Sequence, residues 1–163
     1  MAQDADARLL IEAARRLVDM VLASAQSKQA VAITDLINGL DSLAVLAVRS
    51  NGGEPAELPI EPVENPRDYQ TWRDAALCVL PGLGLYHAPA DPRDVGSNEP
   101  KVVGDAIDDL ADICIELHEG VRLAESIGDV GAASHLRWTF RAHWGKHLRE
   151  LQWLLHSVLT SAD

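Results

Sequence analysis

Apolar residues recur at three- and four-residue steps along most of this chain, and that periodicity constrains the fold more than any other feature. This spacing puts apolar side chains on one face of a helix, and that face must then be buried against other helices. No segment offers the regular alternation expected of a good strand. We therefore predict an all-α fold, a single-domain helical bundle that spans residues 1–163.

Five helices are expected, and two long irregular loops separate them. The first loop, 50–66, contains four prolines and two glycines, a composition that excludes a helix. Asn65 and Pro66 are suited to cap and open the helix that follows it. The second loop covers about 82–100. The expected helices are about 4–25, 28–49, 66–80, 103–127 and 130–159, and the last two form a C-terminal hairpin.

The composition excludes several classes of function. A net charge of −11 over 163 residues disfavours contacts with nucleic-acid phosphates and with anionic lipid. The acidic N-terminal sequence has no basic region followed by an apolar core, so no signal peptide is predicted. No apolar run approaches the ~20 residues of a membrane span. A cytoplasmic protein without nucleic-acid or membrane partners is expected.

The segment expected to form the fourth helix carries an acidic stripe. Asp105, Asp109, Asp112, Glu116 and Glu119 fall on one side of this helix, away from its apolar face. Like charges at this spacing repel each other by about 0.2–0.5 kcal/mol per pair. One interpretation is a site for Mg²⁺ or Mn²⁺, which take oxygen ligands. The other is a solvated face, or one paired with arginines of another helix or subunit (Arg137, Arg141 and Arg149).

The last helix carries two histidines one turn apart, His143 and His147, within an apolar series. Two histidines at this spacing can ligate a metal from one helix, but HExxH requires a glutamate where Trp144 stands, which excludes a zincin-type protease. The alternative is a pair of buried neutral imidazoles bonded to backbone, carboxylate or water. The apolar series that contains them is Ala133, Leu136, Phe140, Leu151, Leu154 and Val158.

Helical-wheel geometry predicts that the two features lie apart, with the histidines toward the core and the stripe toward the surface. Only Asp109, nearest the edge of the stripe, is placed where it could reach both environments. The candidate metal ligands are therefore not expected to form one shared site: Asp109, Asp112, Glu116, His143 and His147. The last helix also has a second apolar face, which is typical of a central helix or of an interface. Trp138, Gly145 and Trp153 are the candidate interface residues, and self-association or a protein partner is expected.

Parts of the sequence resemble two known families. LGLYHAPADP, DDLADI followed by Glu119–Gly120, and the HWGKH run together resemble a bacterial all-helical family, domain of unknown function 5063. This resemblance covers roughly the C-terminal 60% of the chain and implies a small helical cytoplasmic protein with no established activity. The sequence Asp109-Leu-Ala-Asp112 is similar to half of the carboxylate motif of all-α nucleotide pyrophosphatases, which hold Mg²⁺. The ExxE pair that those enzymes carry on an earlier helix is missing here.

Two functions follow as expectations. The first is a non-catalytic interaction or regulatory module that self-associates and has no cofactor. The alternative is a hydrolase of nucleotide phosphoanhydrides that depends on Mg²⁺ or Mn²⁺ at the acidic stripe. No complete catalytic set is present in the sequence, so the balance leans away from an enzyme.

Overall fold

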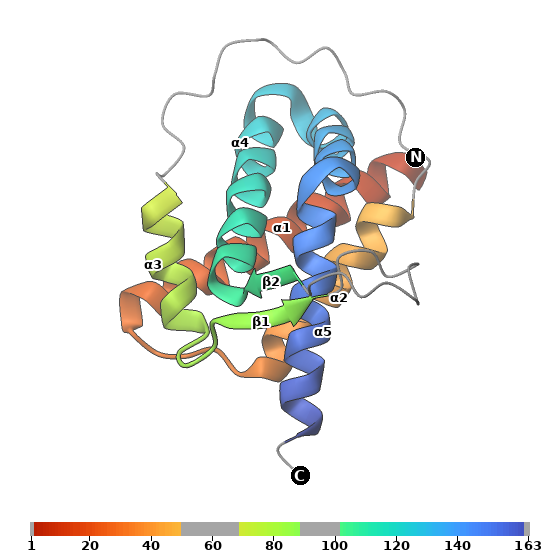
Figure 1. Ribbon diagram of the computed structural model, residues 1–163. Coiled ribbons are helices and arrows are strands. Elements are labelled where there is room, and N and C mark those ends of the chain that lie inside the picture. Colours follow the sequence, from red (N-terminus) through yellow and green to blue (C-terminus); the bar gives the residue numbers. More distant parts are fainter. Residues whose placement is uncertain (1, 50–68, 89–101, 162–163) are drawn as a thin grey trace, which may run out of the picture.

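The fold is all-α, as predicted. A computed structural model describes residues 2–49, 69–88 and 102–161 (Figure 1). The expected loop 50–66 and its capping pair lie outside the described residues, as does the part of the second loop over 89–100. The helices are α1 (Ala2–Ser27), α2 (Ile33–Val48), α3 (Tyr69–Val79), α4 (Ala106–Thr139) and α5 (Gly145–Thr160), with a π-helix, η1 (Phe140–Trp144), between the last two.

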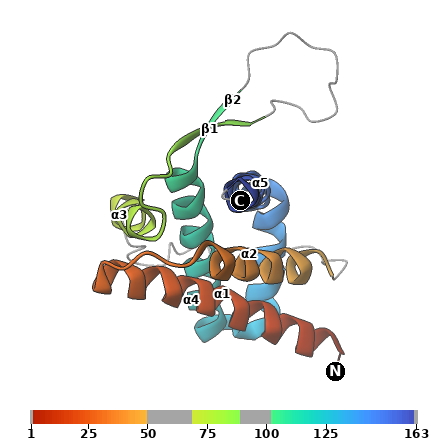
Figure 2. The ribbon, with the colours of Figure 1, turned by 90° about the horizontal axis from the view of Figure 1, so that it is seen from below.

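The helices pack around one apolar core. Figure 2 shows α1 and α2 side by side, α3 and α5 above them, α4 running past α1, and the strands on the side away from α1. All five α-helices contribute fully buried side chains, which include Leu10, Leu40, Trp72, Leu110 and Leu148. Burial of their apolar faces stabilises the bundle by about 25 cal/mol per Å². No helix of the described segments is both long enough and apolar enough to cross a bilayer.

Two expected boundaries are wrong. A short antiparallel sheet, β1 (Leu85–Ala88) with β2 (Val102–Asp105), occupies positions expected to be loop and helix start. Val103 is therefore a strand residue, 55% exposed, and α4 begins at Ala106. Four-residue strands are too short for an alternation to be recognised in the sequence. The second helix begins at Ile33 instead of Lys28, because Lys28 has a left-handed φ of 54° just after α1.

Helix α4 consists of two helical limbs that form a hairpin. Gly128, at φ 78° and ψ 165°, interrupts the helical backbone and reverses the chain where the sequence predicts a helix end. Figure 1 shows the first limb (106–127) rising from the sheet, and the second limb (129–139) running back down into η1 and α5. The limbs pack closely at Gly120, where an added Cβ would lie 2.4 Å from the Leu136 side chain.

The π-helix η1 changes which residues face the core. A π-turn holds one more residue than an α-turn, so the residues after it are rotated relative to an uninterrupted α-helix. The buried series is Leu136, Trp144, Leu148, Leu151 and Leu155, all 0% exposed. His143 and His147, predicted to face the core, are instead 48% and 22% exposed. η1 thus turns both imidazoles away from the core centre and toward the first limb of α4.

Candidate metal centre

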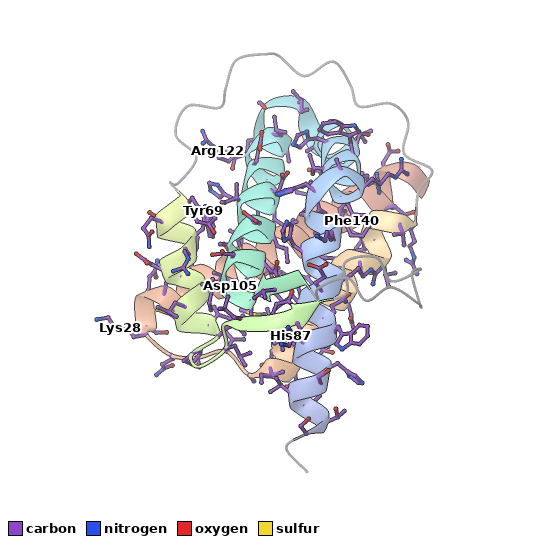
Figure 3. The ribbon with its side chains drawn as sticks, in the orientation of Figure 1. Lys28, Tyr69, His87, Asp105, Arg122 and Phe140 are labelled. Atoms are coloured by element: carbon purple, nitrogen blue, oxygen red, sulfur yellow. The ribbon has the colours of Figure 1, made fainter. Side chains whose placement is uncertain are left out.

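The acidic stripe and the histidines meet where the first limb of α4 faces the returning chain of the second limb, η1 and α5, so the predicted separation of these features is wrong. We call this region the carboxylate–histidine seam. Wheel geometry failed because it omits η1 and because the stripe faces the returning chain instead of open solvent. Figure 3 shows Asp105 where β2 enters α4, and Phe140 of η1 on the returning chain. The seam comprises Asp109, Asp112, Glu116 and Glu119 on the first limb, and His135, His143 and His147 on the returning chain.

Asp109 is the most buried carboxylate of the seam, at 4% exposed. Its Oδ1 lies 2.7 Å from Nδ1 of His147, and its Oδ2 accepts the hydroxyl hydrogen of Tyr86. Tyr86 reaches it from β1, where it is paired with Gly104 of β2; a Cβ on Gly104 would lie 2.5 Å from the Tyr86 ring. Burial and the bond to Asp109 raise the pKa of the Tyr86 hydroxyl, which keeps that hydroxyl protonated as a donor. Asp109 is therefore fixed from two sides.

Glu116 orients the other imidazole in the same way. Its Oε1 lies 3.0 Å from Nδ1 of His143, and its side chain is only 17% exposed. The two rings approach edge to face, with centroids 4.9 Å apart. An ionised carboxylate only accepts hydrogen bonds, so Nδ1 carries the hydrogen in both rings. In the neutral imidazoles the lone pair then lies on Nε2.

Asp112 completes a three-residue group with these rings. Its Oδ2 lies 3.7 Å from Nε2 of His147, too far for a hydrogen bond. One donor atom from each of Asp112, His143 and His147 lies within 4.8 Å of the others. Two donors bound to one ion at about 2.1 Å lie roughly 3–3.5 Å apart, so closure around an ion requires only a small movement. Burial raises the pKa of Asp112, with His147 and His143 opposing it; a bound cation would favour the ionised carboxylate.

The remaining carboxylate of the predicted stripe, Asp105, has a structural role. It is the N-cap residue of α4, and its Oδ1 accepts from the Ile107 amide at 3.0 Å. Nη2 of Arg73, on α3, lies 3.5 Å from Oδ2 of Asp105, and Nε of the same side chain lies 2.9 Å from Oδ1 of Asp108. Among the described residues, none of the four seam carboxylates is paired with a lysine or arginine. Within the described part of the chain, positive charge beside these carboxylates therefore comes from protonated histidine, unless a cation is added.

The candidate interface residues lie in different surroundings. Trp138 and Trp153 are 51% and 69% exposed, as a partner surface requires. Gly145 is buried, and a Cβ there would lie 2.2 Å from the carbonyl oxygen of Phe140. The close backbone approach at Gly145 is thus within the chain itself, at the end of η1. Self-association stays a prediction.

Three residues here are not among the candidate metal ligands predicted from the sequence: Tyr86, His135 and Glu150. Glu150, on α5, places a carboxylate oxygen within 4.8 Å of donor atoms of Asp109 and His147. Tyr86 lies in a strand that the periodicity does not predict, and Glu150 comes into position only after the rotation introduced by η1. The available signal was a competing apolar series, Trp144, Leu148, Leu151 and Leu155. It shares Leu151 with the series that contains the histidines and is otherwise one residue further along the chain.

The Asp109–His147 pair predicts how the metal-free protein responds to pH. The bond to Asp109 raises the pKa of His147 against the opposing effect of burial, and the charges of Asp109, Asp112 and Glu150 add to the increase. A raised histidine pKa contributes stability that is full below the unfolded value, about 6.5, and is lost as pH rises through the folded value. Urea midpoints in a chelating buffer should therefore fall from about pH 6 to pH 8.

The variant His147→Gln should show a flatter pH dependence over that window, whereas the exposed control His156→Gln should follow the unchanged protein. Equal slopes for His147→Gln and the unchanged protein would mean that this pair does not couple folding to pH.

Comparison with protein-family models, with curated proteins and with solved structures gives no match. The resemblance to domain of unknown function 5063 stays a prediction. Function is therefore argued from the geometry of the seam.

Proposed function

We propose that this protein binds a divalent transition-metal ion through His143, His147 and Asp112, and that this centre activates water for hydrolysis. The observation that carries the proposal is the pairing of both Nδ1 atoms with carboxylates, Asp109 for His147 and Glu116 for His143. Histidine ligands of metals are commonly held this way, because the carboxylate fixes the tautomer and makes Nε2 a better donor. The proposal differs from the expected non-catalytic module and develops the hydrolase alternative.

The ligand set favours particular ions. Two imidazoles and one carboxylate suit zinc, iron, manganese, cobalt or nickel better than Mg²⁺, which prefers oxygen ligands alone. The imidazoles change the ion expected from the acidic stripe alone. Three protein ligands also leave coordination positions open, as in catalytic zinc sites.

Partial exposure of the group supports water as the additional ligand. The side chains of Asp112 and His147 are 26% and 22% exposed, and His143 is 48% exposed. If these three side chains held a divalent ion, the chemistry it would supply is a bound water acidic enough to act as a hydroxide nucleophile near neutral pH. Glu150 is the candidate proton acceptor, since it lies beside His147 and orients neither imidazole.

The test follows the ring signals of His143 and His147 by NMR while Zn²⁺ is added to chelator-treated full-length protein. Both signals should shift in the unchanged protein. The zinc affinity obtained from these shifts should fall by more than about 100-fold in Asp112→Asn. It should fall by about 10–100-fold in Asp109→Asn or Glu116→Gln. Asp108→Asn is the matched control on the same helix, because Asp108 is paired with Arg73 outside the seam.

Ring signals that do not respond to Zn²⁺, or that respond equally in Asp112→Asn, would contradict the metal centre. Hydrolysis is tested separately with the zinc-loaded protein, on a nucleoside triphosphate and on an activated ester. Metal binding without turnover of either substrate would retain the centre and remove the hydrolase.

A further inference from the structure

The far end of the seam contains a second group that the centre described above does not use. His135, on the second limb of α4, is only 6% exposed, and neither of its ring nitrogens has a hydrogen-bond partner among the described residues. Buried polar side chains are satisfied in the great majority of proteins. This imidazole has room for a partner other than the described side chains and backbone, and the neighbouring carboxylates would help to hold a bound ion there.

Two carboxylates face this imidazole. Nε2 of His135 lies 4.0 Å from Oε1 of Glu119, beyond hydrogen-bond distance. Donor atoms of Glu116, Glu119 and His135 all lie within 4.8 Å of one another. This separation is too long for direct pairing and slightly longer than that of two ligands on one ion, so an ion can bridge it after a small closure.

Glu116 connects the two groups. Its Oε1 is bonded to Nδ1 of His143, and a carboxylate has a second oxygen that can ligate an ion. The packing of Leu136 against Gly120 holds the limbs together at this level, one residue from both His135 and Glu119. The position of the limbs is therefore fixed by packing, independently of any ion.

We propose that Glu116, Glu119 and His135 form a second divalent-metal site, joined through Glu116 to the site at Asp112, His143 and His147. One imidazole and two carboxylates suit zinc or manganese. Glu116→Gln should then weaken both sites, because it removes the negative charge of a ligand in one site and of the acceptor that orients His143 in the other. Glu119→Gln should weaken only the second site.

The test is calorimetric titration of the metal-free full-length chain with Zn²⁺, with the stoichiometry as readout. Two equivalents are expected for the unchanged protein, and one each for Glu119→Gln and Asp112→Asn. Glu119 is 45% exposed, so its amide variant should fold; Glu125→Gln, exposed on the same limb, is the matched control and should keep two. The ring nitrogens of His135, followed by NMR, should shift with the equivalent that Glu119→Gln loses.

The outcomes separate this site from the first. If the unchanged protein bound one equivalent of Zn²⁺, and Asp112→Asn lost it while Glu119→Gln kept it, the second site would be overturned and the first retained. The reverse pattern would support the second site and overturn the first. Two equivalents in Glu119→Gln, or a His135 ring that does not respond, would also overturn the second site.

Discussion

Gly145→Ala should destabilise the protein by roughly 1–3 kcal/mol, the range for an inserted methyl group in a packed interior. The new Cβ would lie 2.2 Å from the carbonyl oxygen of Phe140, which accepts the Gly145 amide hydrogen at the end of η1. This neighbour is backbone and cannot change rotamer. Relief requires η1 to open or to revert toward an α-turn, and either change rotates His143 and His147 relative to the first limb. Zinc affinity should fall at least about tenfold as well.

Urea unfolding followed by far-UV circular dichroism measures the first effect, and calorimetric titration with Zn²⁺ measures the second. Gly84→Ala is the control, since nothing lies within 4 Å of an added Cβ there and its φ is not in the left-handed range. It should leave both quantities unchanged. If Gly145→Ala had the same free energy of unfolding and the same zinc affinity as the unchanged protein, η1 would not be needed to orient the imidazoles.

Trp144→Ala should be the most destabilising single substitution considered for this chain, at about 3–5 kcal/mol, the usual range for removing a buried aromatic side chain. The indole is 0% exposed and packs edge to face on Phe140, with ring centroids 4.7 Å apart. Its Nε1 donates to the carbonyl oxygen of Leu136 and to Oγ1 of Thr139, both at 3.0 Å. Truncation leaves a cavity and removes a donor that ties η1 to the preceding turn.

Two further variants divide the effect of Trp144. Trp144→Phe keeps most of the ring and removes the donor, so a smaller loss, about 1–3 kcal/mol, is expected. Trp153→Ala is the matched exposed control, at 69% exposure, and should stay within about 0.5 kcal/mol of the unchanged protein. The free energies of unfolding come from urea titration at low protein concentration. A loss for Trp144→Ala no larger than that for Trp153→Ala would contradict the buried role of the indole.

The sequence predicts the helices because their burial depends on a period that can be counted. Leu10, Leu40 and Leu110 are all 0% exposed, as the apolar spacing requires. Gly128 also ends a helical segment where predicted, since its left-handed φ suits glycine. The strands could not be predicted in this way. Tyr86 lies opposite Gly104 through pairing across residues 89–101, and no local period encodes such a pairing.

Five members of the site were predictable from the sequence, and its geometry was not. Asp109, Asp112, Glu116, His143 and His147 are recognisable as candidates from residue type and spacing. Their meeting depends on η1, where the hydrogen-bonding pattern changes for five residues, Phe140–Trp144. A helical wheel assumes the same angle between successive residues along the whole helix. It therefore assigns the wrong faces to the residues after η1. The unpartnered imidazole of His135 is a property of packing that no spacing rule reports.

The reversal at Gly128 also bears on the order of events during folding. All the carboxylates and imidazoles of the seam lie on either side of that turn, in one continuous stretch of chain. Closing a short loop loses less chain entropy than closing a long one, and contacts between near neighbours in sequence favour fast folding. The two limbs can therefore pack against each other before the N-terminal helices, which are more distant in sequence, dock onto them. The Glu116–His143 and Asp109–His147 contacts join residues 27 and 38 positions apart, so they can form within this one stretch of chain.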